Sequence, residues 1–147
     1  MLLPIVLTAA ALAPAHDAIV REARAATALY ASLNRERRAH GLPPLRLDPS
    51  LNGAAFDRVI DMARLQYFGH VSPEGITPWD RMKARNCRFS FAGENIALAQ
   101  SAAQADHALF KSPPHRANSL SENYTRVGIA AMISADGELL VVEDFAG

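Results

Sequence analysis

The stretch Phe91-Ala92-Gly93-Glu94-Asn95-Ile96-Ala97 sets one carboxylate and one amide among apolar residues, directly after a glycine. Such a run predicts the start of a strand whose backbone passes close to another part of the chain. Glutamate is almost never buried without a partner. The sequence offers two candidate partners for Glu94, His70 and His115, each within its own polar and aromatic stretch. We expect the three stretches to meet in one cleft.

The composition is that of one ordinary globular domain. The chain has 147 residues, of which 50% are hydrophobic and 20% are charged, and this is enough to build a core. Fifteen acidic and 15 basic residues cancel, so no nucleic acid or anionic membrane surface is indicated as a partner. Beyond the N-terminal segment, no apolar run is long enough to span a bilayer. We expect a monomer.

Residues 1–15 are typical of a signal peptide. The segment is apolar, has no charged side chain and ends in Ala13-Pro14-Ala15, which fits the small-x-small cleavage pattern. Because no Lys or Arg precedes the apolar region, a buried N-terminal segment is the alternative. We expect cleavage after Ala15, one domain over residues 16–147, and a secreted or periplasmic protein.

Cys87 is the single cysteine of the chain, so no intrachain disulfide can form. In an exported protein such a residue is either buried and inert or free to bridge to another chain. Its place just before the apolar Phe89-Ser90-Phe91 run favours burial.

Helical periodicity predicts two long helices near the N-terminus, over residues 17–40 and 49–66. Gly41 and the prolines after it end the first helix, and the arginines of its last turn complement the helix dipole. Asp48 caps the second helix. The exposed face of the second helix is expected to carry its charged residues, namely Asp57, Arg58, Asp61 and Arg64.

Shorter helices are expected further along the chain. A turn over residues 77–82 should place Trp79 and Met82 on the core, and Ser101 opens a helix that reaches about Phe110. Ser112 before Pro113 is expected to cap another short helix.

The C-terminal region changes to strand patterning. Residues 127–133 alternate between apolar and small or polar positions, Asp136-Gly137 forms a turn, and residues 139–145 return as a second strand. Helices that precede and separate such strands indicate an α+β fold, an α-β-α sandwich with a central antiparallel sheet flanked by helices.

Four motifs then resemble those of a known family. They are Asn34-x-x-Arg37 with Gly41-Leu42-Pro43-Pro44-Leu45; Tyr67-Phe68-Gly69-His70-Val71-Ser72-Pro73; Gly93-Glu94-Asn95-Ile96-Ala97; and Ser112-Pro113-Pro114-His115-Arg116-x-Asn118 with Tyr124-Thr125-Arg126-Val127-Gly128. Together they resemble the bacterial form of the CAP superfamily, which comprises the cysteine-rich secretory, antigen 5 and pathogenesis-related 1 proteins. The resemblance runs from about Ala25 to Phe145.

The resemblance implies a broad central cleft that holds two histidines and two glutamates. His70, Glu94 and His115 match three members of this tetrad, whereas Ser112 stands where eukaryotic members have the second glutamate. Leu109 stands where they have a tryptophan. These departures put in doubt any chemistry that needs two carboxylates.

The chemistry of the matched residues allows several interpretations. Neutral imidazoles bind Zn²⁺ at about 2.0–2.1 Å, and two His with one Glu form a ligand set of open zinc sites. Alternatively, His70 and His115 are the ligands and Glu94 orients a bound water. A third interpretation is that the histidines only hydrogen-bond to Glu94 and Ser112. A Ser112–His115 nucleophile lacks any recognisable third group to orient the base.

Three classes of function therefore stand. We favour a non-enzymatic binding module whose His/Glu cleft holds a divalent metal and a small or lipidic ligand, or a cell-envelope partner. The alternatives are a metal-dependent, peptidase-like hydrolase with Glu94 or Ser112 as catalytic candidates, and a purely structural or interaction domain.

Overall fold

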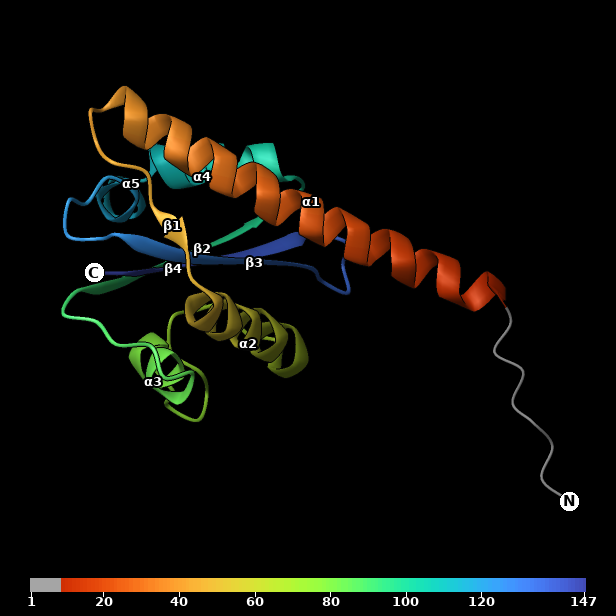
Figure 1. Cartoon of the computed structure of the whole chain (residues 1–147). Helices are drawn as coiled ribbons and strands as arrows, with labels where there is room; N and C mark the ends of the chain where they lie inside the picture. The colour runs from red at the N-terminus through yellow and green to blue at the C-terminus, as the bar shows by residue number, and fades with distance from the viewer. Residues whose placement is uncertain (1–8) are drawn as a thin grey trace, which may run out of the picture.

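The computed structural model describes the backbone of residues 9–147 and the side chains from residue 17 onward. A sheet lies in the middle, with α1, α4 and α5 on one face and α2 and α3 on the other (Figure 1). This arrangement confirms the predicted α-β-α sandwich. In chain order the elements are α1 (Ala9–Ala39), β1 (Arg46–Leu47), α2 (Pro49–Leu65), α3 (Pro78–Ala84), β2 (Ala92–Ala99), α4 (Ala102–Lys111), α5 (Pro113–Ser119), β3 (Arg126–Ile133) and β4 (Leu139–Ala146).

The sheet has the strand order β1-β3-β4-β2. The β3–β4 hairpin and the β2–β4 pair are antiparallel, as the sequence predicts, and the turn residue Gly137 has φ 81°. β1 is parallel to β3, so the sheet is mixed at that edge and the expectation of a purely antiparallel sheet is wrong there. β1 is only two residues long, which is too short to produce an alternating pattern in the sequence.

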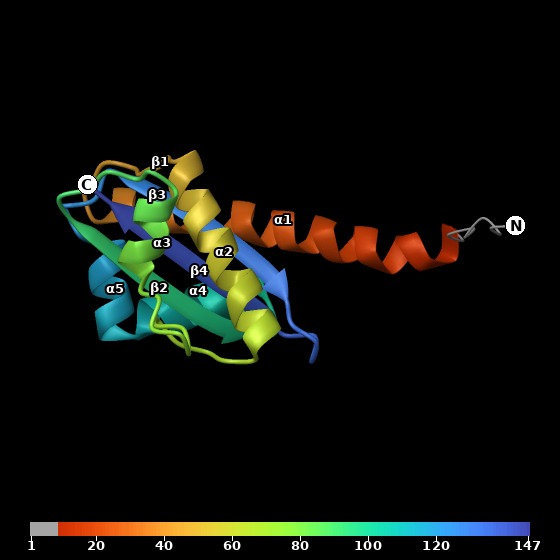
Figure 2. The same cartoon turned by 90° about the horizontal axis from the view of Figure 1, so that it is seen from below.

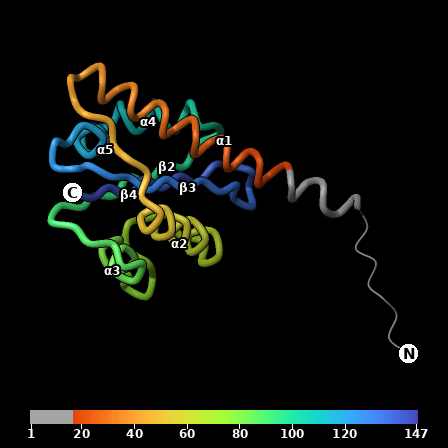
Figure 3. The backbone as a smooth tube through the Cα atoms, viewed as in Figure 1, coloured from red at the N-terminus to blue at the C-terminus, as the bar shows by residue number. Residues whose placement is uncertain are grey.

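The chain crosses from one helical layer to the other through β1 (Figure 3). Gly41 takes φ 72° after α1, and Asp48 begins α2 as the sequence predicts. The Asp48 carboxylate accepts hydrogen bonds from the backbone N–H groups of Ser50 at 2.8 Å and Leu51 at 3.2 Å. This cap fixes the point at which α2 leaves the sheet edge.

The first helix differs from its predicted extent, because α1 begins at Ala9 rather than Asp17. The added residues are mostly alanine, which has the highest helix propensity. Residues 1–8 of the predicted leader lie outside the described residues, and cleavage after Ala15 stays a prediction. Among residues 9–147 no helix combines the length and the apolar character needed to cross a membrane.

Arg37, in the last turn of α1, is fully buried and does more than complement a helix dipole. It donates hydrogen bonds to the carbonyl oxygens of Pro43 at 3.0 Å and of Ser119 and Ser121 at 2.9 Å each. One guanidinium therefore ties the loop after α1 to the end of α5, and its burial lowers its pKa.

Trp79 and Met82 were both expected to pack on the core, and the two predictions have different outcomes. Met82 is buried as expected, whereas Trp79 is 39% exposed on the first turn of α3. Cys87 is buried and unpaired, and burial raises the pKa of its thiol.

The start of α2 packs directly on β3 at Gly128. A Cβ atom at Gly128 would lie 2.0 Å from the backbone carbon of Leu51 and 2.2 Å from the nitrogen of Asn52. These distances are far shorter than a van der Waals contact, and both neighbours are backbone atoms. The second helical layer therefore reaches its position only because residue 128 is glycine.

Gly128→Ala should lower the free energy of unfolding by about 3 kcal/mol or more, because α2 must move away from the sheet. Gly53→Ala is the matched control inside α2, where the new methyl group meets only the flexible Arg85 side chain. That control should be neutral or stabilising by up to about 1 kcal/mol. Urea denaturation of both variants measures the difference, and equal stabilities would contradict the packing described for Gly128.

Candidate functional site

The carboxylate of Glu94 lies at the start of β2, buried under α2. Its Oε2 is 3.3 Å from Nε of Arg58, and its Oε1 is 2.8 Å from Nδ1 of His70. Arg58 and Glu94 are both removed from solvent, with 0% and 2% of their side-chain surfaces exposed. A buried carboxylate requires a partner, and for Glu94 this partner is chiefly Arg58.

Arg58 was expected on the exposed face of its helix, and this prediction is wrong. Besides Glu94, its guanidinium donates to the hydroxyl of Tyr67 at 3.0 Å and to the backbone carbonyl of His70. Asp61, one turn along α2, is also buried and pairs with Arg81 from α3. The face of α2 directed at the cleft is thus charged and buried, and it holds the loop that carries His70.

His115 lies on α5, near enough to His70 for the charge of one ring to act on the other. Its Nδ1 is 2.8 Å from the Ser112 hydroxyl, which makes no capping bond to the helix backbone, contrary to expectation. Burial lowers the pKa of His115, and the nearby His70 charge lowers it further. The imidazole of His115 therefore stays neutral to a lower pH than an ordinary histidine.

Two consecutive acids of β4, which the sequence analysis did not single out, lie beneath the site. Asp144 faces Glu94 across the β2–β4 pair and is 1% exposed. Burial raises its pKa well above the ordinary value, and the charge of Glu94 raises it further. Burial thus favours the neutral form of Asp144 over the charged form. Both acids stand in a strand of mostly apolar residues, so the sequence pattern did not indicate that they belong to the site.

Glu143 points to the opposite face of the sheet from Asp144, toward α5. Its Oε2 accepts a hydrogen bond from Asn95 Nδ2 at 3.1 Å, and the same amide contacts the carbonyl of His115 at 3.1 Å. Burial raises the pKa of Glu143 to about 7. Asn95 thus links a buried acid to the helix that carries His115.

Gly93 allows α5 and the C-terminal loop to approach β2 closely, as the quoted stretch predicts. A Cβ atom at this position would lie 2.5 Å from the Tyr124 hydroxyl and 3.0 Å from Oδ1 of Asn118. Asn118 donates to the Glu94 carbonyl at 3.3 Å and to the side-chain oxygen of Asn95 at 3.0 Å. Both asparagines thus satisfy backbone carbonyl groups.

A cavity of about 340 Å³ lies at the end of β2 nearest α3, and of the residues described above His70, Gly93, Glu94 and Asn118 line it. In Figure 2 the loop from α2 to α3 passes beside β2 on this side of the sheet. The lining residues come from that loop, the start of α3, the start of β2 and α5: His70, Val71, Thr77, Pro78, Trp79, Ala92, Gly93, Glu94 and Asn118.

A sequence model described as the cysteine-rich secretory protein family, CAP, matches residues 30–145. The chain belongs to the CAP family. Among curated relatives, the CAP domain is 38% identical over 97 residues to the uncharacterized protein YkwD of Bacillus subtilis (strain 168), and 34% identical over 91 residues to the uncharacterized membrane protein YlbC of the same organism. These alignments cover 65% and 61% of this chain, but only 38% and 26% of the relatives.

Solved structures show the same fold. An extracellular protein of Bacillus anthracis str. Ames that contains an SCP domain is 31% identical, with a TM-score of 0.74 over 85% of this chain and 41% of that protein. An outer surface protein from Borrelia burgdorferi is 20% identical, with a TM-score of 0.78 over 84% and 92% of the two chains. The second likeness concerns the fold alone.

The CAP domain brings the predicted site residues together in two pairs rather than around Glu94. His70 pairs with Glu94 and His115 pairs with Ser112, while the two histidines interact through their charges. Because both oxygens of Glu94 are occupied, by His70 and Arg58, a two-His-one-Glu ligand set is not formed. No group of three or more His, Cys, Asp or Glu side chains in the described part of the chain is arranged to hold a metal ion.

The two imidazoles are held through the same ring nitrogen. Each ring uses Nδ1 for a hydrogen bond inside the protein, and within residues 9–147 neither Nε2 makes one. A metal-binding histidine commonly donates its other N–H to a carboxylate, as His70 would to Glu94. Ser112 bonds to Nδ1 of His115, whereas a serine nucleophile is activated through Nε2 in the Ser-His-Asp arrangement.

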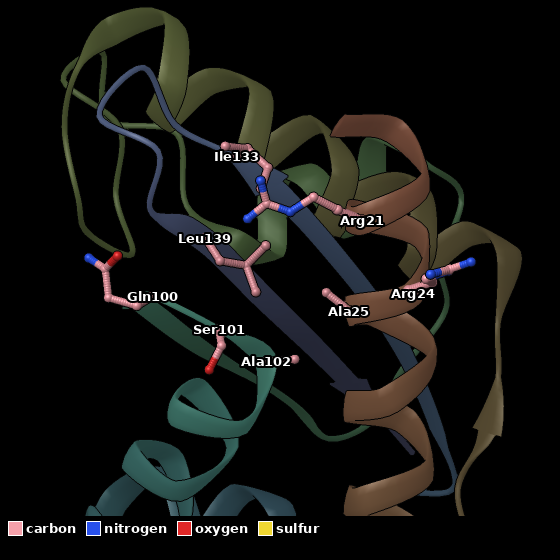
Figure 4. A pocket seen from close by; sticks show the side chains of 8 residues that line it. All are labelled: Arg21, Arg24, Ala25, Gln100, Ser101, Ala102, Ile133 and Leu139. Atoms are coloured by element: carbon pink, nitrogen blue, oxygen red, sulfur yellow. The ribbon is translucent and has the colours of Figure 1, made fainter. Parts of the chain in front are cut away.

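A separate groove lies between α1, the β2–α4 connection and the β3–β4 hairpin (Figure 4). It has a volume of about 270 Å³, and its floor is formed by the apolar side chains of Ala25, Ala102, Ile133 and Leu139. Arg21 extends from α1 toward Ile133 (Figure 4). The groove therefore combines an apolar floor with a cation.

Glu94→Ala should reduce the free energy of unfolding by about 3–5 kcal/mol, because it leaves the Arg58 guanidinium buried without its counter-charge. The matched control is Asp57→Ala, which breaks the partly exposed pair between Asp57 of α2 and Arg85 at the end of α3 and should leave the urea midpoint nearly unchanged. Equal midpoints for Glu94→Ala and the wild type would show that the pair does not support the fold.

Glu143 should make the CAP domain less stable as the pH rises. Its folded pKa of about 7 lies above its ordinary value of 4.5, so its contribution is fully present below pH 4.5 and is lost as the pH approaches 7. Glu143→Gln should abolish a loss on the order of 3 kcal/mol over this range. Denaturation at a series of pH values measures it, with the exposed Glu122→Gln as control.

Proposed function

We propose that this CAP domain is an exported, non-enzymatic binding module whose cleft holds a divalent metal, such as Zn²⁺, between Nε2 of His70 and Nε2 of His115. The observation that supports this most directly is the use of both Nδ1 atoms for internal hydrogen bonds. Export is proposed from the apolar residues 1–15 and from the similarity to the extracellular SCP-domain protein of Bacillus anthracis.

Two imidazoles alone form an open site, so water or another ligand would complete the coordination shell of the metal. The lowered pKa of His115 favours this role, because only a neutral imidazole can ligate. Glu94 acts as a positioning residue that fixes the ring of His70. A bound ion would supply a Lewis-acidic point in the cleft at which an anionic or carbonyl-bearing ligand is held.

We propose a binding role rather than hydrolysis. Ser112 occupies the position of the second carboxylate of the family motif, and its hydroxyl is held by Nδ1 of His115. The carboxylate of Glu94 is engaged by Arg58 and His70, which leaves it no free oxygen with which to activate water. Each candidate for nucleophile or base is thus already bonded to a neighbour.

The zinc site predicts saturable binding to chelator-treated protein at pH 7.5 that weakens at pH 5, as the histidines become protonated. At a hundredfold excess over the dissociation constant, zinc should add about 2.7 kcal/mol to the free energy of unfolding. Calorimetric titration measures the binding. His70→Ala and His115→Ala should each abolish it, whereas His107→Ala on the exposed face of α4 should not. Equal zinc binding by a His70→Ala, His115→Ala double variant would refute the site.

The groove of Figure 4 supports a second ligand class, an amphipathic anion such as a fatty acid. Its tail would cover the apolar floor and its carboxylate would meet Arg21. Cis-parinaric acid, a fluorescent fatty acid, should bind to the wild type, and Arg21→Glu should weaken this binding roughly tenfold. Arg38→Glu, which makes the same charge change at the other end of α1, is the control. Equal weakening by both variants would indicate an effect of net charge and not of the groove.

A further inference from the structure

β2 is the outer strand of the sheet, and its free edge borders the cleft. Phe91 exchanges hydrogen bonds with Gly147 at 3.1 and 2.9 Å on the β4 side. Because backbone groups alternate along an antiparallel strand, those of Ala92 and Glu94 point away from β4. The hydrogen bond from Asn118 to the Glu94 carbonyl confirms this direction, since α5 lies beyond that edge.

Three of these backbone groups on the outer edge of β2 have no hydrogen-bond partner within residues 9–147. The N–H and C=O of Ala92 and the N–H of Glu94 make no hydrogen bond to any described residue, whereas the Glu94 carbonyl accepts from Asn118. They border the cavity of about 340 Å³. A free backbone donor and acceptor beside a concave surface form a binding site for another backbone.

The walls beside this edge are apolar and exposed. Trp79 is 39% exposed and Val71 is 51% exposed, and both line the cavity. Phe91, directly before the free edge, is 52% exposed. Large side chains left in contact with water around a polar edge provide a surface for an apolar side chain of a ligand.

We propose that the cleft binds a short extended peptide, which adds to the edge of β2 as a partial fifth strand. A peptide residue opposite Gly93, in parallel register, donates its N–H to the Ala92 carbonyl and accepts from the Glu94 N–H. The residues before and after it have their side chains on the face of the sheet that carries α2 and α3, as Glu94 does, and an apolar side chain there packs on Trp79. This inference rests on the proposed function, in which this cleft is the binding site, and it names the class of ligand.

The same contacts limit the ligand. Asn118 already donates to the Glu94 carbonyl, so the added strand cannot continue its ladder past that residue. A hydrocarbon ligand would cover the Ala92 and Glu94 groups without pairing them, which costs binding energy. An extended peptide residue supplies both a donor and an acceptor at this spacing, one from each of the two amide units that flank its Cα.

The test is an NMR titration of the metal-free, ¹⁵N-labelled full chain with the capped peptide Ac-Leu-Ala-Leu-NHCH₃, whose alanine lies opposite Gly93. The Glu94 amide proton should move downfield with saturation. A depsipeptide, in which an ester oxygen replaces the alanine N–H, should bind about three- to tenfold more weakly, since one hydrogen bond is lost. Trp79→Ala should weaken binding of the peptide about tenfold, while Phe56→Ala, 50% exposed on α2 outside the cavity lining, should not.

Absence of a saturable shift at Glu94, or equal affinity for the peptide and the depsipeptide, would overturn the inference. Failure of peptide binding in a protein that still binds zinc would overturn this inference alone. Peptide binding with the expected Glu94 shift in a protein that binds no zinc would support it and refute only the metal site.

Discussion

The buried pair of Arg58 and Glu94 is the interaction on which the cleft depends. It places two charges between α2 and the sheet, where neither reaches water. A buried carboxylate without a counter-charge would cost several kcal/mol, so the start of β2 and the middle of α2 must lie together. The guanidinium also holds the carbonyl of His70. One side chain thereby sets the distance between the sheet, the helix and the first histidine loop.

A second buried arginine does the same on the other face of the sheet. Arg37 gathers carbonyl oxygens from the loop after α1 and from the end of α5, the helix that carries His115. The lone Cys87 provides no disulfide. Hydrogen bonds from two guanidinium groups therefore take the place that covalent links have in disulfide-rich domains, since each group can serve several loop carbonyls at once.

The polar interior accounts for the form of the cleft. Each histidine is held by its Nδ1 atom, and Gly93 lets Tyr124 and Asn118 approach β2 closely because it has no side chain. Beneath, burial raises the pKa of both Asp144 and Glu143. The carboxylate of Glu94 differs from these two in having the guanidinium of Arg58 against it.

The sequence by itself determined the sandwich, the β3–β4 hairpin and the helix caps at Asp48 and Thr77, because these depend on local periodicity and turn chemistry. It also determined the three stretches that form the cleft, through the order of their motifs. Only the tertiary structure decided that Arg58 is buried against Glu94, that His115 is held by Ser112, and that Asp144 lies opposite Glu94. Charged residues on a helix normally face water, and a periodic pattern cannot report a partner 36 residues away. Burial and pairing are properties of packed elements, so the ionisation and hydrogen bonding of the site follow from the fold and not from the order of its residues.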